Sequence, residues 1–183
     1  MMGSFFIRPE IPEDIPGIFD VQFQAFGQDG EARLVDALRH DGDYLHGLSL
    51  VAIHRGRIIG HILFPPVAIE SSGAFPERFP ALALAPLAVH QDYQGLGIGT
   101  ALIKEGLLAC QRLGHRAVVV VGHPGYYPRF GFATARTFGI TAPFPCPDEA
   151  FMVIELVAGA LDGVSGMIRY PPAFDTEGAH PAG

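Results

Sequence analysis

Three glycines on alternate residues mark the part of this chain best suited to bind a ligand. They lie in Gln94-Gly-Leu-Gly-Ile-Gly-Thr100, between an apolar run that ends at His90 and an apolar-periodic run that reaches Leu113. This order predicts a strand, a glycine turn and a helix. Glycine leaves the backbone accessible to a ligand. Because the amides at a helix start lack intrahelical partners and lie at the positive end of the helix dipole, the sequence predicts a phosphate site.

Two common phosphate loops do not fit this spacing. A Walker A loop requires a lysine after its last glycine, whereas Gly99 is followed by Thr100 and Ala101. A dinucleotide-binding loop requires Gly-x-Gly-x-x-Gly and an acidic residue on the next strand. The glycines here are spaced Gly-x-Gly-x-Gly, and the next predicted strand, 117–121, contains no acid. The spacing therefore argues against a nucleotide-binding α/β protein.

A third pattern does match. Gln94-x-x-Gly97-x-Gly99 resembles the Gln/Arg-x-x-Gly-x-Gly/Ala signature of the GNAT superfamily of acyl-CoA-dependent N-acetyltransferases. Downstream, Tyr127-Pro-Arg-Phe-Gly-Phe132 resembles the Tyr-x-x-x-Gly-Phe element of the same superfamily. The resemblance extends over nearly the whole chain to the YhbS-like branch of GNAT proteins, and it is carried by residues 31–39, 85–89, 122–127 and 163–166.

The resemblance implies an α/β fold of the GNAT type. In that fold a mixed central sheet of about seven strands has a splayed central pair and helices on both faces. We expect residues 1–175 to form a single GNAT acetyltransferase domain and residues 176–183 to form a disordered C-terminal tail.

The resemblance also implies acetyl-CoA as the co-substrate. The pantetheine arm would pair with the backbone of the splayed strand, as an added strand does, and the pyrophosphate would lie on the amides of the glycine turn. The cofactor-binding residues expected from the resemblance are Leu87, Ala88, Val89, Gln94, Gly95, Leu96, Gly97, Ile98, Gly99 and Thr100.

Catalytic roles follow from the same resemblance. The amide of Val89 or Ala88 would stabilise the oxyanion, and Tyr127, protonated at neutral pH, would be the general acid for the departing thiolate. His123 is the candidate base. Alternatively, His123 caps the following turn or contacts the cofactor, and a water chain removes the proton instead. Tyr126 is expected to pack or to line the acceptor pocket.

The predicted activity is transfer of an acetyl group from acetyl-CoA to a primary amine, by direct attack in a ternary complex. The alternative is a non-catalytic GNAT protein that binds acyl-CoA as a sensor or scaffold. The acceptor, a small-molecule or peptide amine, would be shaped by residues 24–43 and 141–150, and its identity stays open. GNAT proteins often dimerise, so a homodimer is one option for the assembly.

Composition narrows the partners and the location. The chain has 183 residues, of which 49% are hydrophobic, and a formal net charge of −7, which argues against nucleic acid as a partner. Two cysteines are too few for a disulfide framework; Cys110 is expected in the core. No run resembles a signal peptide or a membrane span, so we expect a cytoplasmic protein with no membrane partner. The histidines lack metal-ligand spacing, and no metal is expected.

The elements that must position these residues can be read from periodicity and turn residues. We expect one continuous strand over 82–90 and another over 116–121, with the helix that ends at Leu113 between them. Helices are expected over 12–26 and 31–40, and a short one within 122–131. The other expected strands are 4–8, 48–54, 58–70 with a bend at its two prolines, 133–141 and 151–157, with an edge element within 158–170.

Overall fold

The computed structural model describes residues 3–177. Its strands are β1 (Phe6–Pro9), β2 (Ser49–His54), β3 (Arg57–Leu63), β4 (Pro66–Glu70), β5 (Arg78–Ala83), β6 (Leu87–Val89), β7 (Ala117–Val121), β8 (Ala133–Thr134), β9 (Ile140–Thr141), β10 (Phe151–Glu155) and β11 (Gly166–Arg169). Its α-helices are α1 (Ile15–Phe26), α2 (Gly30–Arg39), α3 (Ile98–Arg112) and α4 (Ala173–Thr176). Short 3-10 helices are η1 (Pro12–Asp14), η2 (His46–Leu48), η3 (Gln91–Tyr93), η4 (Tyr127–Phe130), η5 (Ala135–Phe138) and η6 (Asp148–Ala150).

A long antiparallel hairpin forms the centre of the fold. Its first arm is β3 followed by β4 and its second arm is β5 followed by β6, so that β3 pairs with β6 and β4 pairs with β5. Around it lie a four-stranded sheet, β1-β2-β3-β6, and a seven-stranded sheet, β8-β10-β7-β5-β4-β11-β9. The pairs β5–β7 and β11–β9 are parallel and the others antiparallel, which confirms the predicted mixed sheet.

Proline and glycine positions explain where the expected elements break. The bend expected within 58–70 is present, because β3 ends before Pro65 and β4 begins at Pro66. The prediction of one strand over 82–90 is wrong: residues 84–86 separate β5 from β6, and Pro86 has no amide hydrogen for a ladder. The prediction of one strand over 133–141 is also wrong, since η5 separates β8 from β9 and the two pair with different strands.

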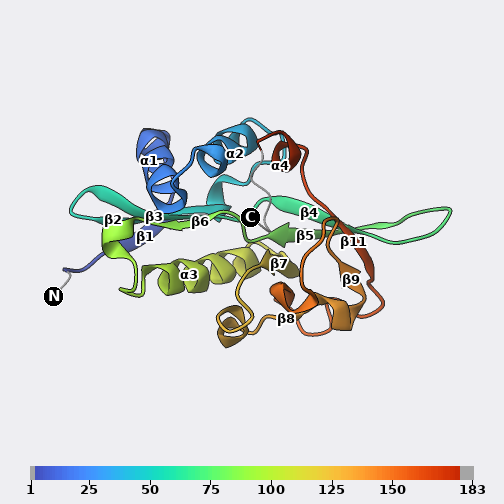
Figure 1. The fold of residues 1–183 in the computed structure, drawn as a ribbon. Coiled ribbons are helices and arrows are strands. Elements are labelled where there is room, and N and C mark those ends of the chain that lie inside the picture. Colours follow the sequence, from blue (N-terminus) through green and yellow to red (C-terminus); the bar gives the residue numbers. More distant parts are fainter. Residues whose placement is uncertain (1–2, 178–183) are drawn as a thin grey trace.

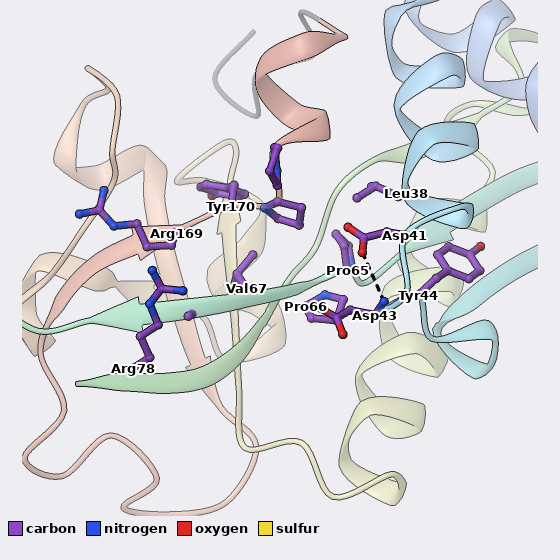
Figure 2. A pocket seen from close by; sticks show the side chains of 13 residues that line it. Leu38, Asp41, Asp43, Tyr44, Pro65, Pro66, Val67, Arg78, Arg169 and Tyr170 are labelled. Atoms are coloured by element: carbon purple, nitrogen blue, oxygen red, sulfur yellow. Dashed lines mark hydrogen bonds between the residues drawn. The ribbon is translucent and has the colours of Figure 1, made fainter. Parts of the chain in front are cut away.

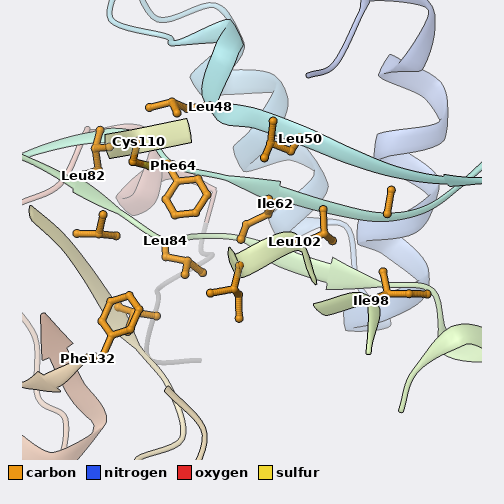
Figure 3. Packing of buried hydrophobic residues seen from close by; sticks show 14 of the residues in the cluster. Leu48, Leu50, Ile62, Phe64, Leu82, Leu84, Ile98, Leu102, Cys110 and Phe132 are labelled. Carbon is orange, nitrogen blue, oxygen red and sulfur yellow. The ribbon is translucent and has the colours of Figure 1, made fainter. Parts of the chain in front are cut away.

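Helices cover both faces of the sheets. In Figure 1, α1, α2 and α4 lie on one face and α3 lies on the other, which confirms the predicted layers. The buried face of α3 presents Ile98, Leu102 and Cys110 to the sheet, where Phe64 and Phe132 join the same cluster (Figure 3). Burial raises the pKa of the Cys110 thiol to about 12, which fits its expected place in the core.

The sequence predicts that the domain ends at residue 175 and that a C-terminal tail begins at residue 176. Thr176, which the sequence assigned to a disordered tail, is the last residue of α4. Residues 178–183 lie outside the described part of the structure.

Candidate functional site

The splay predicted for the central strands begins where β5 ends. The Leu84 amide still donates to the Val119 carbonyl of β7 at 2.8 Å, but the next amide, that of Ala85, donates to Leu63 of β3 instead. From this point β6 follows β3 and leaves β7. The divergence of the two strands is therefore built by a change of hydrogen-bonding partner within two residues.

The backbone of β6 has one unpaired edge as a result. Pro86 and His90, at its two ends, bond to β3 through the Pro86 carbonyl and the His90 amide. Since successive residues of a strand present their backbone groups to opposite edges, Ala88 also faces β3, opposite His61. Leu87 and Val89 face away from β3, toward the gap. The geometry thus favours Val89 over Ala88 as the amide that a ligand in the gap would meet.

Gln94 is tied directly to this edge. Its side-chain amide donates to the Val89 carbonyl at 3.0 Å. That carbonyl is therefore occupied, while the Val89 amide hydrogen and the Leu87 backbone groups keep their place on the open edge. Gln94, one of the predicted cofactor-binding residues, thus holds the end of β6 against the glycine turn.

Each of the three positions in the turn favours glycine for its own structural reason. Gly95 and Gly97 have φ of 75° and 82°, in the left-handed region that favours glycine. Gly99 lies inside the first turn of α3 with ordinary helical backbone. A Cβ built on it would lie 3.6 Å from Val89 Cγ2 and 3.8 Å from the Tyr126 hydroxyl, so it would point into the gap between β6 and η4.

The start of α3 supplies free donors at the same place. The Ala101 amide donates to the Gly97 carbonyl at 3.0 Å, and this is the first hydrogen bond of α3 between residues four apart. The amides of Ile98 to Thr100 precede it and have no intrahelical partner. Ile98 anchors this turn, because its side chain is buried in the core beneath the sheet. Leu96, at the tip of the turn, is 50% exposed.

Tyr126, the residue before η4, contacts this turn. The Tyr126 hydroxyl lies 3.1 Å from Thr100 Oγ1, and the Arg129 guanidinium stacks on its ring at 4.5 Å. Tyr126 therefore packs, as expected, but beside the glycine turn rather than in an acceptor pocket. The signal for this role, a Tyr-x-x-Arg spacing, was present in the sequence.

Tyr127 is held by aromatic packing. Its ring lies against Gly122, where an added Cβ would meet Tyr127 Cε2 at 2.2 Å, and it contacts the rings of Tyr126, Phe130 and Phe132. Burial raises the pKa of its phenol to about 12. The hydroxyl therefore stays protonated at neutral pH.

His123 lies at the turn between β7 and η4. Its backbone carbonyl accepts hydrogen bonds from the amides of Tyr126 and Tyr127, at 3.0 and 3.3 Å. Its side chain is exposed. The main chain of His123 thus closes this turn, while its imidazole is exposed to solvent.

Several groups in or beside the regions expected to shape the acceptor site are engaged elsewhere. Asp29 pairs with Arg33 at 2.6 Å, and Glu31 accepts from Gln28, so both belong to the surface of α2. Phe151 is buried in the core of the seven-stranded sheet. Phe144 lies against Tyr170, with ring centroids 5.8 Å apart.

A buried polar chain that sequence reasoning missed lies beneath α1. Gln22 donates to His61 Nδ1 at 2.9 Å, His61 Nε2 lies 2.8 Å from the Ser49 hydroxyl, and that hydroxyl donates to Glu10 at 2.7 Å. Arg39 also donates to the Glu10 carboxylate. Glutamine at a core position of an apolar-periodic helix was the available signal.

Burial and hydrogen-bond partners set the charges of the residues in this buried polar network. Burial lowers the pKa of His61 to about 4, so the imidazole is neutral. For Glu10, burial opposes ionisation, but hydrogen bonds from Arg39, Ser49 and Tyr44 outweigh it and lower the pKa of the carboxyl. Because the Ser49 hydroxyl gives its hydrogen to the Glu10 carboxylate, His61 must carry its own proton on Nε2.

Two further findings bear on function. Among residues 3–177, no group of three or more histidine, cysteine, aspartate or glutamate side chains is arranged to hold a metal ion. Over the same residues, every helix is too short or too polar to cross a bilayer.

Comparison with known proteins gives a consistent result. A family model described as an acetyltransferase (GNAT) domain matches residues 46–134. The uncharacterized N-acetyltransferase YhbS of Escherichia coli K12 is 38% identical over 169 residues, which cover 92% of this chain and 98% of that protein. The uncharacterized N-acetyltransferase YjhQ of the same organism is 40% identical over 137 residues, 74% of each chain.

Solved structures agree with the sequences. The crystal structure of E. coli YhbS in complex with CoA has a TM-score of 0.85 at 37% identity, and the match covers 96% of this chain and 95% of that one. A GNAT family acetyltransferase from Brucella melitensis in complex with acetyl-CoA has a TM-score of 0.75 at 34% identity, with 94% and 99% covered. The open edge of β6, the glycine turn and this similarity along nearly the whole chain lead to one conclusion: the protein belongs to the GNAT family of N-acetyltransferases.

Proposed function

We propose that this protein transfers an acetyl group from acetyl-CoA to a primary amine, which attacks the thioester directly in a ternary complex. The observation that carries the proposal is the open edge of β6 beside the start of α3. It presents the backbone groups of Leu87 and the amide of Val89 next to the amides of residues 98–100, which lack intrahelical partners. Relatives at 37% and 34% identity that hold CoA and acetyl-CoA support the same cofactor here.

The residues of the gap fit such a cofactor. The backbone groups of Leu87 would pair with the amides of the pantetheine arm as an added strand, which leaves the Val89 amide for the thioester oxygen. The amides of Ile98 to Thr100 would receive the pyrophosphate at the positive end of α3. The bare Cα of Gly99 leaves room between Val89 and Tyr126, and Tyr126 and Thr100 border the same space.

Bound acetyl-CoA supplies the acetyl group as a thioester. The Val89 amide would donate to the oxygen that becomes negative during attack; removing a donor in that role costs on the order of 2.7–4 kcal/mol. Tyr127, which is protonated at neutral pH, would donate a hydrogen bond and then its proton to the departing sulfur. His123, exposed at the turn before η4, would take a proton from the acceptor ammonium, so that the neutral amine can attack the thioester.

The acceptor proposed is a small-molecule or peptide amine. We also propose a cytoplasmic location, since the thiols of Cys110 and Cys146 are both free and suit a reducing compartment. The proposed domain spans residues 1–175.

Tyr127→Phe tests the proposal against a non-catalytic acyl-CoA sensor. The variant keeps the ring against Gly122 and loses only the hydroxyl. An enzyme should keep its affinity for CoA and lose turnover by about 10²–10⁴-fold, the usual contribution of general acid catalysis. Tyr126→Phe is the matched control, because it removes a neighbouring hydroxyl that bonds Thr100. CoA release from acetyl-CoA with a panel of amines is the assay; absence of turnover in every form, with CoA binding intact, would favour the sensor.

A further inference from the structure

The sheet opens a second time, on the opposite side of the central hairpin from β6. There β2 pairs with β3 and β11 pairs with β4. The ends of β2 and β11 are separated near Pro65, which connects β3 to β4. A cavity of about 400 Å³ occupies this opening (Figure 2). The end of α2 with the following loop forms one wall, and residues 169–172 form the opposite wall.

Charges of opposite sign line opposite sides of this cavity. Figure 2 shows the carboxylates of Asp41 and Asp43 on one side and the guanidinium groups of Arg78 and Arg169 on the other. Val67 and Tyr170 lie between the two pairs. A ligand that spans the cavity would therefore meet negative charge at one end and positive charge at the other.

Within residues 3–177, the protein does not fully balance the charge at either end of the cavity. Arg78 and Arg169 both pair with the single carboxylate of Glu70, through Nε contacts of 2.8 and 3.0 Å, which leaves one positive charge in excess. Among the residues that the structure describes, no cationic side chain pairs with Asp41 or Asp43; the one contact here is the Asp43 amide donating to Asp41 at 3.3 Å. Both carboxylates are exposed at the cavity and would attract a cationic group of a ligand.

The floor of the cavity adds a backbone acceptor. The Pro65 carbonyl accepts from the Ala83 amide of β5, so by alternation the Pro66 carbonyl faces the other edge of the strand. The ladder between β4 and β11 ends at the pair Ala68–Arg169, and Pro171 has no amide hydrogen to extend it. A hydrogen-bond donor on a ligand could therefore bond the Pro66 carbonyl from inside the cavity.

From this arrangement we infer a second ligand site in the protein, for a small dipolar molecule of dipeptide size that carries an ammonium group and a carboxylate. The ammonium group binds at Asp41, Asp43 and the Pro66 carbonyl. The carboxylate binds across Arg78 and Arg169, whose planar guanidinium groups suit it. Both side walls, near residues 38–44 and 169–172, lie outside the segment matched by the acetyltransferase family model.

Calorimetric titration of the full chain with alanyl-alanine, without acetyl-CoA, tests the inference. The dipeptide should bind, whereas its N-acetyl derivative, which lacks the ammonium group, and its C-terminal amide, which lacks the carboxylate, should each bind about ten- to hundredfold more weakly, as expected for the loss of a charge-assisted contact. Equal affinity for the three compounds, or no binding of the dipeptide at millimolar concentration, would overturn it.

Two variants locate the ligand. Asp43→Asn and Arg78→Gln should each weaken alanyl-alanine binding by at least about tenfold, since each removes one charged partner. Asp162→Asn and Arg136→Gln, which change the same residue types outside the cavity, should leave it unaltered. Saturating CoA should not compete with the dipeptide; competition would place the dipeptide in the gap beside β6 and refute a separate site. Because binding is read without turnover, the result is independent of the proposed acetyl transfer.

Discussion

Gly99→Ala separates the stability of the glycine turn from its affinity for a cofactor. Gly99 has helical backbone, and the added methyl group would lie 3.6 Å from Val89 Cγ2 and 3.8 Å from the Tyr126 hydroxyl, which are ordinary contact distances. The protein without cofactor should therefore accept the change. Replacing a helical glycine by alanine stabilises by up to about 1 kcal/mol, so the midpoint of thermal unfolding should stay constant or rise by about 2–4 °C.

Cofactor affinity should change in the opposite direction. The methyl group points into the gap between β6 and η4, where a phosphate must come within about 2.9 Å of the amides of α3 to form hydrogen bonds. Loss of one charge-assisted hydrogen bond costs about 1.5–3 kcal/mol. The dissociation constant for CoA should therefore increase by roughly ten- to hundredfold.

The assay is calorimetric titration with CoA, together with thermal unfolding of the unliganded protein. Gly42→Ala is the matched control, because Gly42 also has ordinary backbone and nothing within 4 Å of its added Cβ. Gly97→Ala is less informative, since its φ of 82° strains any side chain and lowers stability as well. Wild-type affinity for CoA in a stable Gly99→Ala variant would refute the proposed path of the pyrophosphate.

Three further predictions concern the scaffold, and unfolding in urea measures all of them. Gly106→Ala should destabilise by about 1–3 kcal/mol, because its Cβ would clash with the Phe64 ring; an unchanged midpoint would contradict this packing. Glu10→Gln should cost about 3–5 kcal/mol at neutral pH by leaving Arg39 without its buried partner. Since the pKa of Glu10 is lowered in the fold, the difference from wild type should shrink as pH falls from the ordinary glutamate pKa toward the lowered one. The pKa of His61 is lower in the folded protein than in the unfolded chain, so the unfolded chain binds the proton first as pH falls. Wild-type stability should therefore fall as pH drops from about 6.5 toward 4. A His61→Gln variant that retains this slope would refute the assignment.

Much of the candidate site could be predicted from the sequence because its determinants are local. The positive φ of Gly95 and Gly97, the start of α3 at Ile98 and the turn after β7 depend on residues only a few positions apart. The apolar period of α3 likewise placed Cys110 in the core before any partner was known. Glycine preference and helical periodicity are properties of short segments, and the sequence displays them directly.

The pairing of distant segments required the tertiary structure. The unpaired edge of β6 exists because the Ala85 amide bonds to Leu63 of β3, a choice of partner that strand propensity does not contain. The break of the expected strand 82–90, the contact of Tyr126 with Thr100, and the cavity beside Pro65 have the same origin. The sequence by itself determined which segments could form a phosphate-binding turn and an aromatic neighbour. Packing between segments 20 or more residues apart decided which backbone groups stay free, because a group is free only when every competing strand has found another partner.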